Sequence, residues 1–569
     1  MATALESASL VMAPCGYEDG TLGSLQPTDG SGDFTFTRGS NLSATRVNAA
    51  GNIEKGYENL LLQSNSFSNA TWAKSSVSVT SGQSGYDGTN DAWLLSKSAS
   101  NAYINQSNIT NGVQAFSIYA KANESNFLYV RIYSDSPRVY FDLINGVATN
   151  SGPVISSSME DVGDGWYRCS FSTNLTGANF LRIYPAEAAF DSSATTGSIY
   201  IQDAQINQGL VAYPYIETTT TTAQGGILED TPRIDYSSGP NGSLLLEPSR
   251  TNLIPYSEYF VGSGWQRREI VVYPNQSTAP DGTLTATNLA INGGNSELSF
   301  LKSSGLVIGA DMVFSFYVKK VSNSLPKYAI YDNTNLNYII PRTLYNITEE
   351  WVRVEIPFTI PTGCTSIKCG IVYQSGSGAE GTNINIWGAQ LEEASYPTSY
   401  IPTYGTSVTR AGDVCGDAGN SSTFNDSEGV LYAEIAALAD DSTHRFILLG
   451  DGTSQNEVRM AFENFGTSII SLRVTVSGTP QAFEWKQFSL PSILNYKKIA
   501  IVYAENRFEL WVNGVKERSS SSGSTFPSST LDRLDFKLAS GQLFYGNVKQ
   551  VVYFPTALSD AALIELTTL

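Results

Sequence analysis

The stretch Asn59-Leu-Leu-Leu-Gln-Ser-Asn-Ser-Phe67, followed by Trp72, decides the fold because the chain contains it twice. The second copy reads Asn252-Leu-Ile-Pro-Tyr-Ser-Glu-Tyr-Phe260 and is followed by Trp265. The two asparagines are separated by as many residues as the two tryptophans, so the blocks align without a gap. A repeat on this scale predicts two copies of one domain in tandem.

Further landmarks follow this block in the same order in both copies. They are Asp87-Gly-Thr and Asp281-Gly-Thr; Phe116-Ser-Ile-Tyr-Ala-Lys and Phe314-Ser-Phe-Tyr-Val-Lys; Trp166-Tyr-Arg and Trp351-Val-Arg; Ile201-Gln-Asp-Ala-Gln and Ile386-Trp-Gly-Ala-Gln; Tyr213-Pro-Tyr-Ile and Tyr396-Pro-Thr-Ser-Tyr-Ile. Several of these runs alternate between apolar and polar residues, as half-buried strands do, and Gly, Asn, Asp and Ser separate them. We therefore predict two jelly-roll domains, at 59–217 and 252–403.

The composition also favours β-structure. The chain of 569 residues holds 31 Tyr and 25 Phe but only 5 Met, and 41% of its residues are hydrophobic, which is enough for several cores. Aromatic and β-branched residues suit a pleated, half-buried surface. Long Ala/Leu/Glu/Lys runs typical of helices are absent. The predicted fold class is all-β, with tandem β-sandwich domains.

A third sandwich is expected at 429–569. Phe508-Glu-Leu-Trp-Val and Val515 flank Asn513-Gly514, a strong hairpin signal. Near the end, Ser559 is placed to cap a short helix that begins at Asp560. The remaining parts are then an N-terminal docking segment over 1–58 and linkers over 218–251 and 404–428.

Three parts of the chain resemble known families. The hairpin at 508–515 and the run Val551-Val-Tyr-Phe-Pro-Thr-Ala-Leu-Ser-Asp560 resemble the end of the concanavalin A-like (laminin G-like) lectin/glucanase sandwich. The duplicated domain, with its closing run from Gly388 to Pro402, resembles the carbohydrate-binding-module jelly rolls of phage tail and head fibres. The run Pro27-Thr-Asp-Gly-Ser-Gly-Asp-Phe-Thr-Phe-Thr-Arg38 is similar to fibre-type proteins of Bacteroidetes phages, including crAss-like ones.

This resemblance implies a structural protein of a virion surface that adheres to host or mucus glycans. It implies capsid, portal or tail proteins as partners and a homo-oligomer, with a trimer as the first expectation. It also implies synthesis in the bacterial cytoplasm and release by lysis. Two alternatives stay open at this point: a capsid decoration or fibre protein that binds no ligand, and the accessory binding region of a secreted polysaccharide-active enzyme.

Charge and cysteine content narrow the class of protein. The net charge of −19 disfavours nucleic acid and anionic membranes as partners. No run approaches the roughly 18 apolar residues of a membrane span, and the first basic residue is Arg38, which argues against a secretory signal. The five cysteines and single histidine nearly exclude a Cys/His zinc site. Cys364 and Cys369 could pair across a turn, although we expect reduced thiols.

We predict no enzymatic activity. Retaining glucanases related to the concanavalin A-like fold carry Glu-x-Asp-x-x-Glu on one strand, and no such run occurs between 429 and 569. The nearest acidic pair, Glu505 and Glu509, is interpreted as surface. His444, the only candidate base for a Ser-His-Asp arrangement, lies in a turn-like stretch and is interpreted as surface or packing.

Two binding features remain. Asp87 and Asp281 stand in matching Asp-Gly-Thr turns, where carboxylate and backbone oxygens could hold a structural Ca²⁺. An ordinary Asp turn is the favoured alternative, and no other cofactor is expected. Aromatic side chains could stack on sugar rings, but the sequence alone does not distinguish exposed rings from core rings.

Overall fold

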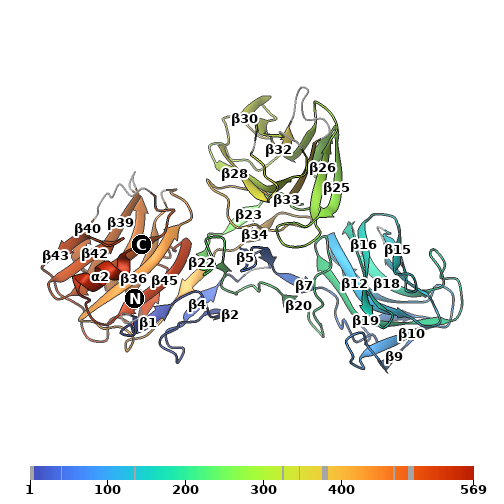
Figure 1. The fold of residues 1–569 in the computed structure, drawn as a ribbon, viewed down its shortest axis with the longest axis horizontal. Helices are drawn as coiled ribbons and strands as arrows, with labels where there is room; N and C mark the ends of the chain where they lie inside the picture. The colour runs from blue at the N-terminus through green and yellow to red at the C-terminus, as the bar shows by residue number, and fades with distance from the viewer. Residues whose placement is uncertain are drawn as a thin grey trace. The chain divides into compact units, whose positions relative to one another are not determined.

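The fold is described from a computed structural model, which covers residues 5–39, 42–133, 136–177, 179–322, 326–344, 346–373, 382–441, 443–464, 468–484 and 492–569. The prediction of an all-β protein built from tandem β-sandwiches is confirmed (Figure 1). The chain divides into two compact units. One unit holds 55–226 and 251–408, and the other holds 1–54, 227–250 and 409–569.

The first jelly roll consists of two antiparallel sheets of six described strands each. One sheet has the order β16 (Val154–Gly163), β17 (Trp166–Leu175), β12 (Gly112–Ala122), β19 (Gly197–Gln208), β10 (Ala92–Lys97), β9 (Val77–Gln83). The other has the order β15 (Val147–Ser151), β14 (Arg138–Asp142), β13 (Phe127–Tyr133), β18 (Asn179–Ala186), β11 (Tyr103–Ile109), β8 (Ala73–Ser75). The core between them includes Trp72, Phe116, Ile118 and Val130.

The second jelly roll repeats this plan with two sheets of five described strands. One has the order β24 (Trp265–Arg268), β27 (Glu297–Lys302), β32 (Ile367–Tyr373), β29 (Lys327–Asp332), β30 (Asn337–Leu344). The other has the order β25 (Ile270–Ser277), β26 (Ala286–Ile291), β33 (Thr382–Glu392), β28 (Asp311–Lys320), β31 (Val352–Thr359). Two-stranded ladders join β7 (Tyr57–Asn59) to β20 (Ala223–Gly225), β5 (Thr45–Val47) to β6 (Ile53–Lys55), and β23 (Arg250–Asn252) to β34 (Val408–Arg410).

The repeated landmark residues make the same hydrogen bonds in both jelly rolls. The side-chain amide of an entry asparagine donates to two carbonyl oxygens of later segments: Asn59 to Ala204 and Ile216, and Asn252 to Ala389 and Ile401. The indole N–H groups of Trp72 and Trp265 each donate to a nearby backbone carbonyl at 2.9 Å. The asparagines tie the first segment of each sandwich to its last, and the tryptophans fix the fold of the first segment itself, which explains why the sequence carries both residues twice.

The unit that contains the C-terminus is a third sandwich. Its larger sheet has the order β21 (Ile234–Asp235), β22 (Ser243–Leu246), β45 (Gly546–Phe554), β36 (Glu428–Ala437), β41 (Lys497–Ala504), β42 (Arg507–Val512), β43 (Val515–Ser520), with β1 (Leu10–Met12) also paired to β45. The facing sheet is β40 (Thr479–Glu484), β39 (Ser468–Val476), β38 (Glu457–Asn464), β37 (Arg445–Gly450), β44 (Arg533–Asp535). A small sheet joins β2 (Tyr17–Glu18), β3 (Thr21–Leu22), β4 (Phe34–Thr37) and β35 (Val414–Gly416).

Local signals in this unit are confirmed. Asn513 and Gly514 both have positive φ (48° and 84°), as the two-residue turn between β42 and β43 requires. Helix α2 (Asp560–Thr567) begins at the Ser559 cap, whose hydroxyl accepts from the backbone N–H of Ala562.

The segments expected to be an N-terminal docking segment and linkers contribute strands to this unit. Strand β1 pairs with β45, and β21 and β22 extend the same sheet. Leu10, Met12 and Leu244 are completely buried in its core. The sequence alone did not show this, because each stretch is short and its strand partners are hundreds of residues away.

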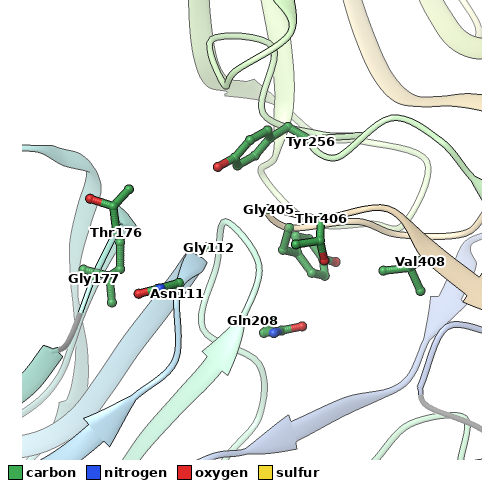
Figure 2. Close-up of a pocket in the computed structure, with 11 residues that line it drawn as sticks. Asn111, Gly112, Thr176, Gly177, Gln208, Tyr256, Gly405, Thr406 and Val408 are labelled. Carbon is green, nitrogen blue, oxygen red and sulfur yellow. The ribbon is translucent and has the colours of Figure 1, made fainter. Parts of the chain in front are cut away.

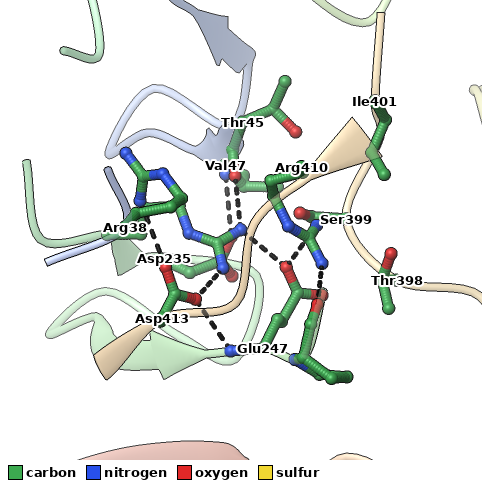
Figure 3. A network of polar contacts seen from close by, with 12 residues as sticks. Arg38, Thr45, Val47, Asp235, Glu247, Thr398, Ser399, Ile401, Arg410 and Asp413 are labelled. Atoms are coloured by element: carbon green, nitrogen blue, oxygen red, sulfur yellow. Dashed lines mark hydrogen bonds and ion pairs between the residues drawn. The ribbon is translucent and has the colours of Figure 1, made fainter. Parts of the chain in front are cut away.

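A buried ionic network holds these segments together (Figure 3). The Asp413 carboxylate pairs with Arg38 at 3.2 Å and with Arg233, and the Glu247 carboxylate pairs with Arg233 at 2.6 Å and Arg410 at 2.8 Å. All five side chains are at most 3% exposed. Two carboxylates therefore link three separate stretches of chain inside the unit.

Candidate functional site

The outer face of the β15–β8 sheet in the first jelly roll carries a row of tyrosines. Tyr129 of β13 lies opposite Tyr140 of β14 and Tyr184 of β18 in the strand register. The ring centroids of Tyr129 and Tyr140 are 4.2 Å apart, and those of Tyr129 and Tyr184 are 4.6 Å apart. These rings form a cluster of their own, separate from the sandwich core, so they do not serve to fill it.

A row of arginines runs beside the tyrosines on the same face. Arg131 lies opposite Arg138 of β14 and Arg182 of β18. The Arg182 guanidinium carbon lies 4.2 Å from the ring centroid of Tyr103 and 4.7 Å from that of Tyr133, and the Arg131 guanidinium lies 4.6 Å from Tyr133. We call the two rows, with the rings that flank them, the aromatic–arginine face.

Two rings of this face are exposed to solvent. Tyr133 is 40% exposed and stacks on Phe180 at 4.9 Å, while Phe190 is 60% exposed and packs against Tyr140 at 4.9 Å. Phe190 has a φ of 65°, a region that bulky residues rarely adopt, inside a turn closed by a bond from Asp191 N–H to Ala188 O. Such strain costs about 1–3 kcal/mol and is concentrated at functional sites.

The hydroxyls of Tyr129, Tyr140 and Tyr184 stay protonated at neutral pH. Burial, together with the neighbouring Tyr140, raises the pKa of Tyr129 to about 12, and burial also raises the pKa of Tyr140 and of Tyr184. These three tyrosines are buried and hold the face together, while the partly exposed guanidinium groups beside them can donate hydrogen bonds to a ligand. That combination of rings and guanidinium groups suits a ligand with both flat apolar surfaces and many oxygen atoms.

The second jelly roll carries a related face with different charges. Tyr331, Tyr338 and Tyr373 cluster on the equivalent sheet, and the Arg342 guanidinium lies 5.0 Å from the Tyr338 ring. Here a carboxylate is present as well. Glu297 pairs with Arg268 at 3.3 Å and with Lys368 at 3.5 Å.

The pattern of residues along the strands of this sheet is itself a signal for the site, although the sequence analysis above did not identify it. In Phe127-Leu-Tyr-Val-Arg-Ile-Tyr133 the core side of the strand is Leu, Val and Ile, whereas every residue on the other side is aromatic or arginine. An ordinary solvent face would carry small polar or charged residues instead. Phe180-x-Arg182-x-Tyr184 and Arg138-x-Tyr140 repeat the pattern on neighbouring strands.

The surroundings of Asp281 do not fit the predicted Ca²⁺ site. Its carboxylate lies 2.6 Å from the Lys55 ammonium, which also pairs with Glu258 at 3.0 Å, and all three side chains are at most 3% exposed. An ammonium therefore already takes the place beside this carboxylate that a metal cation would need. The Thr283 hydroxyl and backbone N–H complete an ordinary Asp turn.

At Asp87 the Ca²⁺ site stays a prediction. One carboxylate oxygen of Asp87 accepts from the backbone N–H of Thr89, as in the matching turn. Asp91 and Asp203 lie near Asp87. Burial of Asp203, together with the charges of Asp91 and Asp87, raises the pKa of Asp203 to about 7. In the described ranges, no group of three or more His, Cys, Asp or Glu side chains is arranged to hold a metal ion.

A pocket of about 250 Å³ lies where the two jelly rolls meet (Figure 2). Tyr256 of the second jelly roll and Asn111, Gly112 and Gln208 of the first line it. The backbone N–H of Val113 donates to the carbonyl of Tyr404 at 2.7 Å, and a Cβ at Gly112 would lie 2.1 Å from that carbonyl oxygen. The pocket has no charged lining residue and is smaller than typical ligand sites, so we interpret it as a packing gap.

The residues considered for catalysis take structural positions. Glu505 is exposed as expected, but the interpretation of Glu509 as surface is wrong. Glu509 is buried and accepts from Arg507, Lys516 and the indole of Trp511, because these longer side chains cover it within β42. The His444 ring stacks on Phe446.

Comparisons with known proteins add little. No protein-family model matches the chain, and no curated protein matches it. A solved structure with a distant likeness is the N-terminal CBM22-1–CBM22-2 tandem domain of Xyn10C from Paenibacillus barcinonensis. The match covers 63% of this chain and 99% of that chain, at 10% identity and a TM-score of 0.21. A likeness at that level decides nothing about the ligand of this protein.

Proposed function

We propose that this protein is a non-enzymatic, glycan-binding component of a virion surface. The observation that carries the glycan-binding part is the aromatic–arginine face of the first jelly roll. Exposed Tyr133 and Phe190 offer rings on which a sugar can stack, and the guanidinium groups of the arginine row offer hydrogen bonds to its hydroxyls. A strained turn that exposes Phe190 is hard to explain by stability alone.

The virion part of the proposal rests on resemblance in sequence. The N-terminal run 27–38 and the closing run 388–402 are similar to phage fibre proteins, and the C-terminal sandwich resembles the concanavalin A-like fold. In this proposal other virion proteins are the partners, the chain forms a homo-oligomer, and the particle is its location. Among the described residues, no helix combines the length and the apolar character needed to cross a membrane.

Binding of the full chain to a glycan array and to immobilised polysaccharides tests the glycan part. We expect binding that Phe190→Ala or Tyr133→Ala weakens about two- to tenfold, since a stacked aromatic contact contributes about 0.5–1.5 kcal/mol. Tyr273→Ala is the matched control because Tyr273 is 48% exposed but lies on β25 of the second jelly roll. Silence across bacterial and mucin glycans would instead favour a purely structural protein.

Mass spectrometry and antibody labelling of purified particles test the virion part. We expect to detect the chain in the particles. Its copy number per particle should be a multiple of the number of subunits in the oligomer. Its absence from particles and presence in the secreted fraction would favour the accessory region of a polysaccharide-active enzyme. A reducing-sugar assay on the bound polysaccharides tests the absence of hydrolysis.

A further inference from the structure

The arginine row on the aromatic–arginine face is electrostatically unfavourable by itself. Arg138, Arg131 and Arg182 lie directly opposite one another on three adjacent strands. Like charges in directly opposite positions of a sheet destabilise it. A chain with a net charge of −19 has many carboxylates that could be placed beside them. The row therefore needs an explanation other than folding.

None of these three arginines forms an ion pair with a residue that the structure describes. Arg131 donates to the Ser136 hydroxyl at 3.3 Å. Asp142, at the end of the same face, is occupied by its own turn and accepts from two backbone N–H groups. By contrast, the buried Arg233 and Arg410 of the other unit are matched with carboxylates.

Aromatic stacking holds the guanidinium groups in place. The planar group of Arg182 lies within 5.2 Å of the ring centroids of Tyr103, Tyr133 and Phe180. A stacked guanidinium uses its face for the ring and keeps the N–H groups in its plane for a ligand. Its fork of N–H donors matches the paired oxygens of a carboxylate or a sulfate.

We infer that the aromatic–arginine face of the first jelly roll binds an anionic glycan, one whose sugars carry carboxylate or sulfate groups. The inference rests on the proposed glycan-binding function and names its ligand class. The rings of Tyr133 and Phe190 supply stacking for the sugar, and the arginine row supplies the charge that complements its anionic group. A carboxylate and a sulfate would both accept hydrogen bonds from the same guanidinium groups, and the experiment distinguishes between them.

The second jelly roll supplies the contrast. Its Glu297 carboxylate pairs with both neighbouring cations, Arg268 and Lys368, and it would repel an anionic sugar. Arg342 stands on that face without a row of further arginines opposite it, since its strand pairs only with β29 in the described sheet. Among the described residues, we therefore expect selective binding of an anionic sugar at the face of the first jelly roll and not at that of the second.

The test is calorimetric titration of the full chain with matched glycans. Polygalacturonate is compared with its methyl ester, which lacks the charge, and dextran sulfate is compared with dextran. Polyphosphate serves as an anion without sugar rings. Arg182→Gln and Arg131→Gln remove charge from the row, Phe190→Ala removes a ring, and Arg342→Gln is the matched control. Melting temperatures show whether each variant folds.

We expect at least one anionic glycan to bind about tenfold or more tightly than its neutral counterpart, and binding to weaken as salt is added. The carboxylate or sulfate arm that binds identifies the anion. Arg182→Gln should lose about tenfold or more in affinity, because a hydrogen bond to a charged group contributes about 1.5–3 kcal/mol. Arg342→Gln should bind as the wild type does.

Equal affinity for charged and neutral glycans, unchanged by salt or by either arginine variant, would overturn the anionic inference. If Phe190→Ala still weakened that binding, the glycan-binding function would stand without it. The inference would also be overturned if polyphosphate bound as tightly as the anionic glycan and if Phe190→Ala left its affinity unchanged. The face would then bind anions without recognising a sugar. No binding of any glycan would overturn both proposals. Should the arginine variants fail to fold, the salt and methyl-ester comparisons on the wild type decide the question.

Discussion

At the scale of single residues, Asp203 makes the stability of the first jelly roll depend on pH. Burial raises its pKa to about 7, far above the roughly 3.9 of an unfolded chain. A raised folded pKa means that protonated Asp203 stabilises the fold below about pH 4. That contribution is lost as the pH rises from about 4 to about 7.

We expect Asp203→Asn to stabilise the protein at pH 8 by about 2 kcal/mol, because Asn carries no charge to bury. Asn can still accept the bond from the Tyr86 hydroxyl, and it tolerates the φ of 56° at this position. Thermal melts from pH 4 to 8 measure the effect, and the variant's curve should be flatter. A rise in wild-type melting temperature with Ca²⁺ that the variant abolishes would reveal a cation at Asp87, Asp91 and Asp203 instead.

The cysteines give a second prediction at this scale. All five are unpaired, and Cys15 alone among them is exposed. Burial raises the pKa of Cys169, Cys369 and Cys415, which keeps these thiols protonated and unreactive. Titration of the native protein with a thiol reagent should therefore detect one fast-reacting group, and Cys15→Ser should remove it. A fully denatured sample should show all five.

At the scale of elements, the sequence predicts what is local and misses what depends on register. The Asn513-Gly514 turn and the Ser559 cap follow from neighbouring residues, and the structure shows both. The repeated Asn and Trp landmarks are also readable because each copy needs the same bonds. Arg131 and Arg182, however, become neighbours only through the pairing of β13 with β18, which no single stretch of sequence reveals.

The buried ionic network belongs to the scale of elements because it connects short strands that are far apart in the sequence. Asp413→Ala should destabilise the protein by about 3–5 kcal/mol, since it leaves Arg38 and Arg233 buried with one carboxylate fewer. Chemical denaturation followed by fluorescence measures the change. Asp532→Ala is the control: its pair with Arg533 is about 40% exposed, so we expect a change below about 1 kcal/mol. Equal effects of the two variants would argue against the network's role.

At the scale of the whole molecule, the compact units are not continuous stretches of sequence. The third sandwich appears from its sequence to begin at 429, yet its core also contains large apolar side chains from earlier segments. These are Leu10, Met12, Phe34, Phe36, Leu244 and Leu246, each at most 1% exposed. Burial of a side chain of this size contributes about 1.5–3 kcal/mol. Together they rival the entire stability of a typical domain, about 5–15 kcal/mol.

A fragment of residues 429–569 should therefore not fold on its own, although it covers the whole stretch that resembles a complete domain. Without β1 and β22 it would leave the edge of β45 that faces away from β36 unpaired and one side of its core open to water. Circular dichroism should show no cooperative melt, and a hydrophobic dye should bind. The fragment 55–408 is the control: it spans one unit, interrupted only by 227–250, and should melt cooperatively. If 429–569 melted as sharply as the full chain, its core would be complete without the segments 1–54 and 227–250. These segments would then not be needed for the stability of the third sandwich.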